Sequence, residues 1–126
     1  MNKEPENQHL VSTSVRAELR LRVLRALEIN PELSQRQLAA QLGVSLGGVN
    51  YALKALVERG FVKANNFRKA GNKLAYLYVL TPKGVAEKAI LASAFLGRKL
   101  EEYEVLSQEI EILKNDVGMK DSGRKG

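Results

Sequence analysis

The 126-residue sequence lacks cysteine and contains a single histidine, His9. Without cysteine, neither disulfide bonds nor thiolate metal sites can form. One histidine without cysteine also argues against a zinc site and against catalysis by a histidine base. We therefore expect no metal, no cofactor and no enzymatic activity.

Long apolar runs are absent as well. No stretch approaches the roughly 18 apolar residues that a membrane-spanning helix requires. The first ten residues, MNKEPENQHL, contain no apolar segment that resembles a signal peptide. These absences predict a cytoplasmic protein that does not bind a membrane.

Acidic residues are missing from one long stretch of the chain. Residues 1–81 hold twelve Lys/Arg and six Asp/Glu, a net charge of +6, whereas residues 82–126 hold eight of each. Residues 59–83 contain no acid and six basic residues, namely Arg59, Lys63, Arg68, Lys69, Lys73 and Lys83. A local positive field of this kind favours a polyanionic partner.

The first predicted element is a helix. Residues 1–12 are polar and contain Pro5, so we expect a disordered leader there. Ser14 can cap a helix that ends at Ile29, because Asn30-Pro31 stops it. Apolar residues recur at helical spacing in this segment, at Val15, Leu19, Val23, Leu24 and Leu27.

Two short helices separated by a tight turn follow. Ser34 and Gln37 fit a capping box at the start of a helix over residues 35–42. Gly43 can end that helix in the left-handed conformation. Ser45 can cap the next helix, which runs to about Arg59.

After Gly60 the hydrophobic period changes from helix to strand. The runs FVKAN and KLAYLYVL predict a two-stranded hairpin with a basic tip and a turn at Gly71-Asn72. Tyr76 and Tyr78 fall on one face of the second strand and are expected to serve the sheet or the core. Thr81-Pro82 then begins a last helix that runs to about Val117.

Two adjacent glycines, Gly47 and Gly48, stand near the start of the third predicted helix. A phosphate-binding loop would need Lys and Ser/Thr where Val49 and Asn50 stand. A flexible break would leave the following apolar face without support. A helix N-terminus pressed against DNA explains the glycines, because glycine lets the backbone N–H groups approach a phosphate closely.

A helix-turn-helix followed by a basic hairpin is a winged helix. The stretch LSQRQLAAQLGVSLGGVNYALKALVERGFVKA, the basic wing and YVLTPKG together resemble the DNA-binding domain of MarR-type transcriptional regulators. The resemblance covers about residues 14–90, and within that family it points to the small branch associated with exopolysaccharide gene clusters.

The sequence departs from that family outside the winged helix. Typical members add a longer N-terminal helical region and two C-terminal helices, and many bind a small effector beside them. This chain has a short leader and one long C-terminal helix, so the sequence does not establish whether an effector exists.

DNA contacts are expected from three places. In the major groove, Asn50 can read adenine, Leu46 can touch a thymine methyl, and Tyr51 can reach a base or a phosphate. Lys54 can reach a phosphate. The residues that the helix-turn-helix geometry turns outward there are Ser45, Leu46, Gly47, Asn50, Tyr51 and Lys54. The start of the second helix offers Ser34, Gln35 and Arg36 to a backbone phosphate, and the wing offers Arg68, Lys69, Asn72 and Lys73 to the minor groove.

The last helix carries a heptad pattern that predicts a coiled coil between two copies. Lys99 interrupts the apolar seam, and the neighbouring Leu100 can replace it. The expected dimerisation residues are Leu96, Leu100, Tyr103, Leu106, Ile110, Leu113 and Val117. A parallel pair would bring Glu109 near Lys114 of the other copy; an antiparallel pair and a helix folded onto its own domain remain open.

Together these patterns predict a mainly α (α+β) protein: a winged helix-turn-helix with a two-stranded basic wing and a long C-terminal dimerisation helix. The expected division is a leader at 1–12, the winged helix at 13–81, the coiled-coil helix at 82–118 and a disordered tail at 119–126. The predicted function is sequence-specific regulation of transcription by a homodimer on a palindromic double-stranded DNA operator. The alternative is a winged-helix module that binds proteins and reads no DNA sequence.

Overall fold

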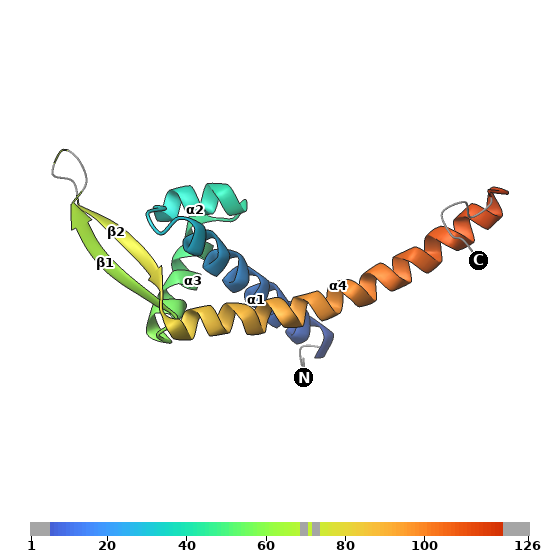
Figure 1. Ribbon diagram of the computed structural model, residues 1–126, viewed down its shortest axis with the longest axis horizontal. Helices are drawn as coiled ribbons and strands as arrows, with labels where there is room; N and C mark the ends of the chain where they lie inside the picture. The colour runs from blue at the N-terminus through green and yellow to red at the C-terminus, as the bar shows by residue number, and fades with distance from the viewer. Residues whose placement is uncertain (1–5, 69–70, 72–73, 120–126) are drawn as a thin grey trace, which may run out of the picture. The chain divides into compact units, whose positions relative to one another are not determined.

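The computed structural model describes the backbone of residues 6–68, 71 and 74–119, and the side chains of 14–67, 71 and 75–119. Its elements are α1 (Glu6–Ile29), α2 (Gln35–Leu42), α3 (Leu46–Glu58), β1 (Val62–Arg68), β2 (Leu74–Leu80) and α4 (Pro82–Asp116). The chain divides into two compact units, Met1–Ala92 and Ser93–Gly126. Figure 1 labels the elements.

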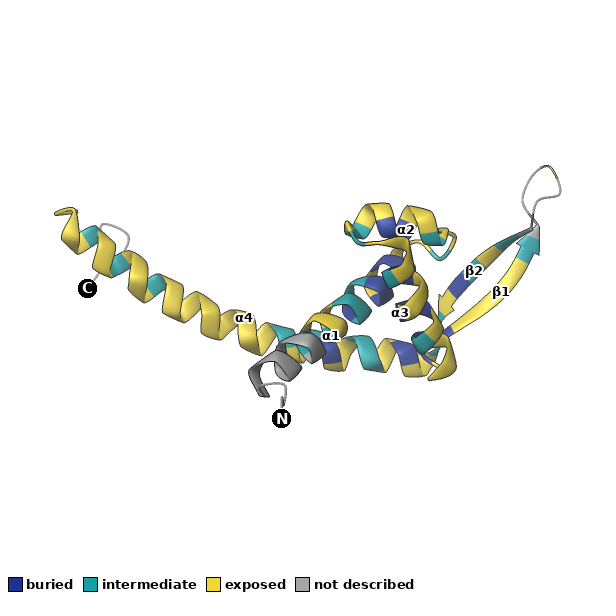
Figure 2. Ribbon diagram, turned by 180° about the vertical axis from the view of Figure 1, so that it is seen from behind, coloured by how far each residue is buried: buried dark blue, intermediate teal, exposed yellow. Residues whose placement is uncertain are grey.

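The core of the first unit lies where α1, α2, α3 and the base of the hairpin meet (Figure 2). Burying each large aliphatic side chain there contributes about 1.5–3 kcal/mol. The fully buried side chains are Val23, Leu24, Leu27, Leu38, Val49, Leu56 and Val62. The core positions predicted on the first helix are therefore confirmed at Val23, Leu24 and Leu27.

Helix α1 begins earlier than the sequence predicted. It starts at Glu6 rather than after Ser14, so residues 6–12 are helical where a disordered leader was expected. No proline or glycine lies between Pro5 and Ser14 to stop the helix from extending. Val15 is 59% exposed, against expectation, and among the side chains described from Ser14 onward the first buried one is Leu21.

The turn between α2 and α3 forms as the sequence predicted. Ser34 and Gln37 make the reciprocal hydrogen bonds of a capping box, and Gly43 ends α2 at φ 69°. Ser45 caps α3 by accepting a hydrogen bond from the backbone N–H of Gly48 at 3.0 Å. These caps satisfy backbone groups that would otherwise lack partners at the helix ends.

Strands β1 and β2 form an antiparallel hairpin with Val62 opposite Leu80 and Arg68 opposite Leu74. Gly71, at φ 84°, lies in the turn between them. The backbone N–H of Tyr78 donates to the carbonyl of Pro31 at 3.0 Å. This bond attaches β2 to the loop that follows α1.

Thr81 caps α4, as the sequence predicted. Its hydroxyl donates to the Gly60 carbonyl at 2.6 Å and accepts from the Gly84 N–H at 3.0 Å. Gly84 is required here for a steric reason, because a Cβ on it would lie 1.9 Å from the carbonyl oxygen of Phe61. The start of α4 is thereby packed against the start of the wing.

The first part of α4 belongs to the first unit. Leu91 is buried there, and Lys88 pairs with Glu28 of α1. The units divide at Ala92–Ser93, inside the helix, rather than at its first residue. The separation into a DNA-binding part and a dimerisation helix at residue 82 stays a prediction.

Within the second unit, α4 continues to Asp116, one residue short of the predicted end. Gly118, at φ 82°, follows the helix, and the Met119 N–H donates to the Lys114 carbonyl at 2.8 Å. Among the described helices, none combines the length and the apolar character needed to cross a bilayer.

Candidate nucleic-acid interface

Helix α3 buries one face and exposes the other. Val49, Ala52, Leu53 and Leu56 are buried against the rest of the unit. The six residues expected to face outward are all exposed, namely Ser45, Leu46, Gly47, Asn50, Tyr51 and Lys54. The face that the sequence assigned to DNA is therefore open to solvent, and its contacts with DNA stay a prediction.

The two glycines at the start of α3 occupy different environments. A Cβ on Gly47 would meet no atom within 4 Å, so this residue leaves an open notch on the outward face. A Cβ on Gly48 would lie 3.1 Å from the hydroxyl oxygen of Ser45, which is the helix cap. Gly47 is thus the glycine whose missing side chain would let another molecule approach the backbone.

A hydrogen-bonded chain links α3, α2 and β2. The side-chain nitrogen of Asn50 donates to the side-chain oxygen of Gln35 at 3.0 Å. The side-chain nitrogen of Gln35 in turn donates to the hydroxyl of Tyr78 at 3.2 Å. The phosphate contact expected at this helix end involves the backbone N–H groups of its first turn and stays a prediction, while the side-chain amide of Gln35 is engaged with two protein side chains.

The two tyrosines of β2 lie beside this chain of hydrogen bonds. Tyr78 is 6% exposed and Tyr76 is 55% exposed, and their rings stack with centroids 5.9 Å apart. Together with Asn50 and Lys54 they line an open groove between α3 and β2. Tyr78 is a core residue, as expected, whereas Tyr76 presents an aromatic edge next to the outward face of α3.

Arg36 and Ser34 lie at the start of α2. Both are exposed, but the Ser34 hydroxyl already accepts a hydrogen bond from the Gln37 N–H at 3.1 Å. The Ser34 O–H can still donate to a phosphate, and Arg36 adds a guanidinium at the same helix end.

The wing residues lie largely outside the described part of the chain. The backbone of Arg68 ends β1, while its side chain and Lys69, Asn72 and Lys73 are not among the described residues. Their expected contacts with the minor groove stay a prediction.

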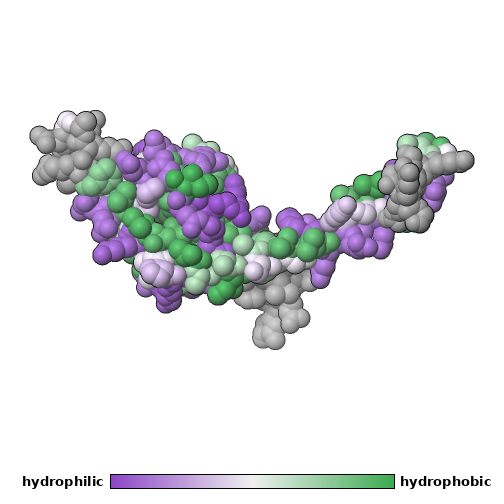
Figure 3. All heavy atoms as spheres, in the orientation of Figure 1, coloured by the Kyte–Doolittle hydropathy of each residue, from purple (hydrophilic) through white to green (hydrophobic). Residues whose placement is uncertain are grey.

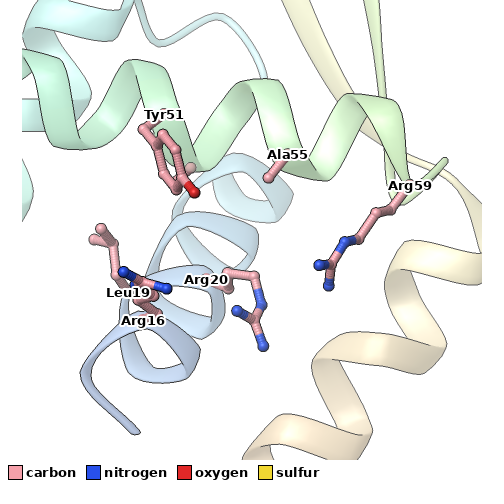
Figure 4. A pocket seen from close by; sticks show the side chains of 7 residues that line it. Arg16, Leu19, Arg20, Tyr51, Ala55 and Arg59 are labelled. Atoms are coloured by element: carbon pink, nitrogen blue, oxygen red, sulfur yellow. The ribbon is translucent and has the colours of Figure 1, made fainter. Parts of the chain in front are cut away.

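A second basic feature lies between α1 and α3. Figure 4 shows Arg16 and Arg20 from α1, and Tyr51 and Arg59 from α3, pointing into the space between the two helices. These residues line a pocket of about 310 Å³. The Nε atom of Arg20 is buried there without a hydrogen-bond partner. The sequence analysis missed this pocket, because it joins residues of two helices that are far apart in the sequence.

Some basic residues also serve the fold. The Lys83 ammonium donates to the carbonyl of Arg59 at 3.0 Å and lies 5.2 Å from the centre of the Phe61 ring. The Arg22 guanidinium donates to the carbonyl of Leu42 at 2.6 Å, at the end of α2. Both cations donate to carbonyl groups at helix C-termini, where the helix dipole favours positive charge. The exposed Lys83 keeps its charge, and this contact places its ammonium at the end of α3.

The apolar seam of the second unit is open. Its side chains are between 43% and 74% exposed, and they are Leu96, Leu100, Tyr103, Leu106, Ile110, Leu113 and Val117. Figure 3 shows hydrophobic and hydrophilic side chains next to one another along this helix. Within the described residues, no group of His, Asp and Glu is arranged to hold a metal ion.

The comparisons with known proteins agree with this geometry. Residues 16–63, which run from α1 to the start of β1, match the family described as winged helix-turn-helix DNA-binding. The chain has a winged-helix fold. The search of curated proteins gives no match.

Solved winged-helix structures resemble the chain at low sequence identity. A transcriptional regulator of Thermoplasma acidophilum is 22% identical, with a TM-score of 0.61 over 74% of this chain and 94% of its own. A MarR/EmrR family transcriptional regulator of Acinetobacter sp. ADP1 is 20% identical, with a TM-score of 0.51 over 79% of this chain and 74% of its own. A transcriptional regulator homologue of Pyrococcus horikoshii OT3 is 17% identical, with a TM-score of 0.53 over 68% and 83%. At these identities the likeness establishes the fold.

Proposed function

We propose that this protein is a MarR-type transcriptional regulator that binds double-stranded DNA through its winged helix and performs no catalysis. The single observation that carries the proposal is the outward face of α3. That face is exposed, begins at a capped N-terminus and has an open notch at Gly47. Such a helix end attracts a phosphate, and the residues that follow it can reach base edges.

Each exposed residue of this face has a chemical role in the proposal. Asn50 reads adenine through its amide, Leu46 contacts a thymine methyl, and Tyr51 reaches a base or a phosphate. Lys54 contacts a phosphate. Arg36 at the start of α2 adds a phosphate contact. The wing residues Arg68, Lys69, Asn72 and Lys73 extend the contact into the minor groove.

The regulator acts as a homodimer in this proposal. One recognition helix contacts few bases, whereas two copies related by a two-fold axis read both halves of a palindrome. The exposed seam of the second unit supplies the apolar surface for pairing. The cytoplasm is the proposed location, and the resemblance to the small branch alone suggests exopolysaccharide genes as targets.

Selection of bound sequences from a random pool of duplex DNA tests the proposal. We expect an enriched palindrome with half-sites separated by about 10 base pairs or a multiple of that spacing. Binding to the enriched site should fall steeply with added salt, because phosphate contacts release counterions. No enrichment and no duplex binding at low salt would favour the protein-binding module instead.

A further inference from the structure

The apolar seam of the second unit is flanked by two different rows of side chains. Heptad positions a and d form the seam, with Leu96, Tyr103, Ile110 and Val117 at a, and Lys99, Leu106 and Leu113 at d. The row at position g consists of Phe95 and the three acids Glu102, Glu109 and Asp116. The row at position e consists of Leu100, Ser107 and Lys114, so Leu100, counted with the seam above, lies at its edge. All these residues belong to one unit, so their placement on the helix does not depend on the first unit.

We propose that the partner of this seam is the same segment of a second copy, paired in parallel and in register. The inference rests on the homodimer proposed above and assigns the orientation that the heptad pattern alone leaves open. Position g of one helix faces position e of the following heptad on the other helix in a parallel pair. Glu109 then faces Lys114 of the second copy, and the pair occurs twice by symmetry.

The other flanking contacts of a parallel pair are also compatible. Glu102 faces the neutral Ser107, and the half-buried Phe95 faces the apolar Leu100. Lys114 also lies 3.7 Å from Glu111 of its own helix, so Glu109 of the second copy would share this ammonium with an intrahelical partner. No acid faces an acid along the described helix in this orientation.

An antiparallel pair is disfavoured by the acidic row. In that orientation position g faces position g of the other copy. We consider antiparallel alignments in which more than half of residues 93–116 of one copy overlaps the other copy. In each of them, at least one acid of the g row, which contains Glu102, Glu109 and Asp116, faces an acid of that row on the other copy. Like charges directly opposite each other are destabilising, so the row acts against this orientation.

Lys99 fixes the register of the parallel pair. Its ammonium lies 3.4 Å from the carboxylate of Glu102 on the same helix, which offsets its charge. In the aligned pair Lys99 stands opposite its own equivalent. This like-charge contact lowers the stability of the aligned pair, and the Glu102 carboxylate on each helix offsets part of that cost. A shift by one heptad would place this charge against an apolar residue, so a single polar layer selects the aligned register.

Cysteine cross-linking tests the orientation, and the chain is suited to it because it contains no cysteine. The single variants Leu96→Cys and Leu113→Cys are prepared in the full chain and oxidised without DNA. A parallel pair brings both positions opposite their equivalents, so both variants should form covalent dimers. An antiparallel pair can align at most one of them, because the two positions are about 26 Å apart along a helix and a disulfide needs Cα atoms within about 7 Å.

The matched control is Gln108→Cys, which lies on the opposite side of the helix from the seam and should remain uncross-linked. The parallel orientation would be overturned by strong cross-linking at only one of the two seam positions. It would also be overturned if neither position cross-linked in a chain that still sediments as a dimer. A chain that sediments as a monomer would overturn the homodimer itself. The two failures are therefore distinguishable.

A charge reversal gives an independent test, because it changes the stability of a parallel and of an antiparallel dimer in opposite directions. In a parallel pair, Glu109→Lys places a second ammonium group opposite Lys114 and should weaken the dimer about 4- to 25-fold, or two- to five-fold for each symmetric pair. The double variant with Lys114→Glu should recover the dimer. In the fully overlapping antiparallel pair Glu109 faces Glu102, so Glu109→Lys would strengthen the dimer, and that result would contradict the proposal. Glu104→Lys, with the same charge change away from both flanks, is the control, and sedimentation gives the dissociation constants.

Discussion

The side-chain amide of Asn50 is oriented by Gln35, whose oxygen accepts a hydrogen bond from the Asn50 nitrogen at 3.0 Å. Because the Gln35 nitrogen donates to Tyr78, its oxygen must face Asn50. One N–H of Asn50 is used in this contact, which leaves one N–H and the carbonyl oxygen for another molecule. Adenine presents one acceptor and one donor in the major groove, so the remaining groups of Asn50 fit that base.

The first prediction concerns Asn50→Ala. We expect this change to lower the preference for the selected operator by about 1–3 kcal/mol per half-site, because a bidentate base contact is lost. Affinity for random duplex DNA should change little. Competition titrations with specific and random duplexes measure the ratio, and an unchanged ratio would exclude a base-reading role for Asn50.

The second prediction concerns Gln35→Leu, which keeps the bulk of the side chain and removes its hydrogen bonds. Asn50 then loses its orienting partner, so discrimination at the adenine position should weaken by less than in Asn50→Ala. Affinity for random DNA and its salt dependence should stay the same. Gln41→Leu, an exposed glutamine on the same helix, is the control. Equal effects of the two variants would mean that Gln35 does not position Asn50.

Local sequence signals predicted most of the fold, because caps and turns depend on a few neighbouring residues. Ser34 with Gln37, Ser45, Gly43 and Thr81 each satisfy nearby backbone groups, and the structure has each of them at the expected helix end. The predicted start of α1 after Ser14 was wrong, because residues 6–13 contain no proline or glycine that would mark where the helix begins.

Contacts between distant residues could not be predicted in the same way. Gln35 and Tyr78 are 43 residues apart, and they meet only because β2 also bonds to the loop after α1. The first turn of α2 indicated a phosphate site for Gln35, and nothing in that segment reveals a tyrosine beside it. The pocket that Arg20 and Arg59 share depends likewise on how α1 packs against α3.

The third prediction concerns Gly47→Ala. A methyl group at this position meets no atom of the protein, and alanine favours a helix, so stability should stay the same or rise by up to about 1 kcal/mol. The methyl group would, however, fill the notch where DNA is proposed to approach. DNA affinity should fall by about 1.5–3 kcal/mol for each charge-assisted hydrogen bond that is lost.

The control for Gly47→Ala is Gly97→Ala, since Gly97 is also a helical glycine with open space around its Cβ position. Gly97→Ala should stabilise α4 without changing DNA affinity. Thermal unfolding and duplex titration separate the two properties. If Gly47→Ala bound DNA as well as the unmodified protein, the backbone of this turn would not contact the duplex.

The fourth prediction concerns Gly84→Ala, which should destabilise the protein. The added methyl group would overlap the carbonyl of Phe61, and this oxygen is fixed because it accepts a hydrogen bond from the Thr81 N–H at 3.0 Å. Relief requires α4 to move away from the wing, at a cost of about 1–3 kcal/mol. Chemical denaturation measures the loss, and a stability equal to that of Gly97→Ala would contradict the close packing.

The last prediction concerns Lys54→Ala. Lys54 is exposed on the outward face of α3, and its proposed contact is a phosphate, which carries no sequence information. Its removal should weaken binding to the operator and to random duplexes by the same factor. The slope of log affinity against log salt should fall in magnitude by about 1. Arg25→Ala removes the same charge from an exposed site on α1 and serves as the control for the net charge. Because a long-range charge effect would appear in both variants, only a larger change of slope in Lys54→Ala supports a direct phosphate contact.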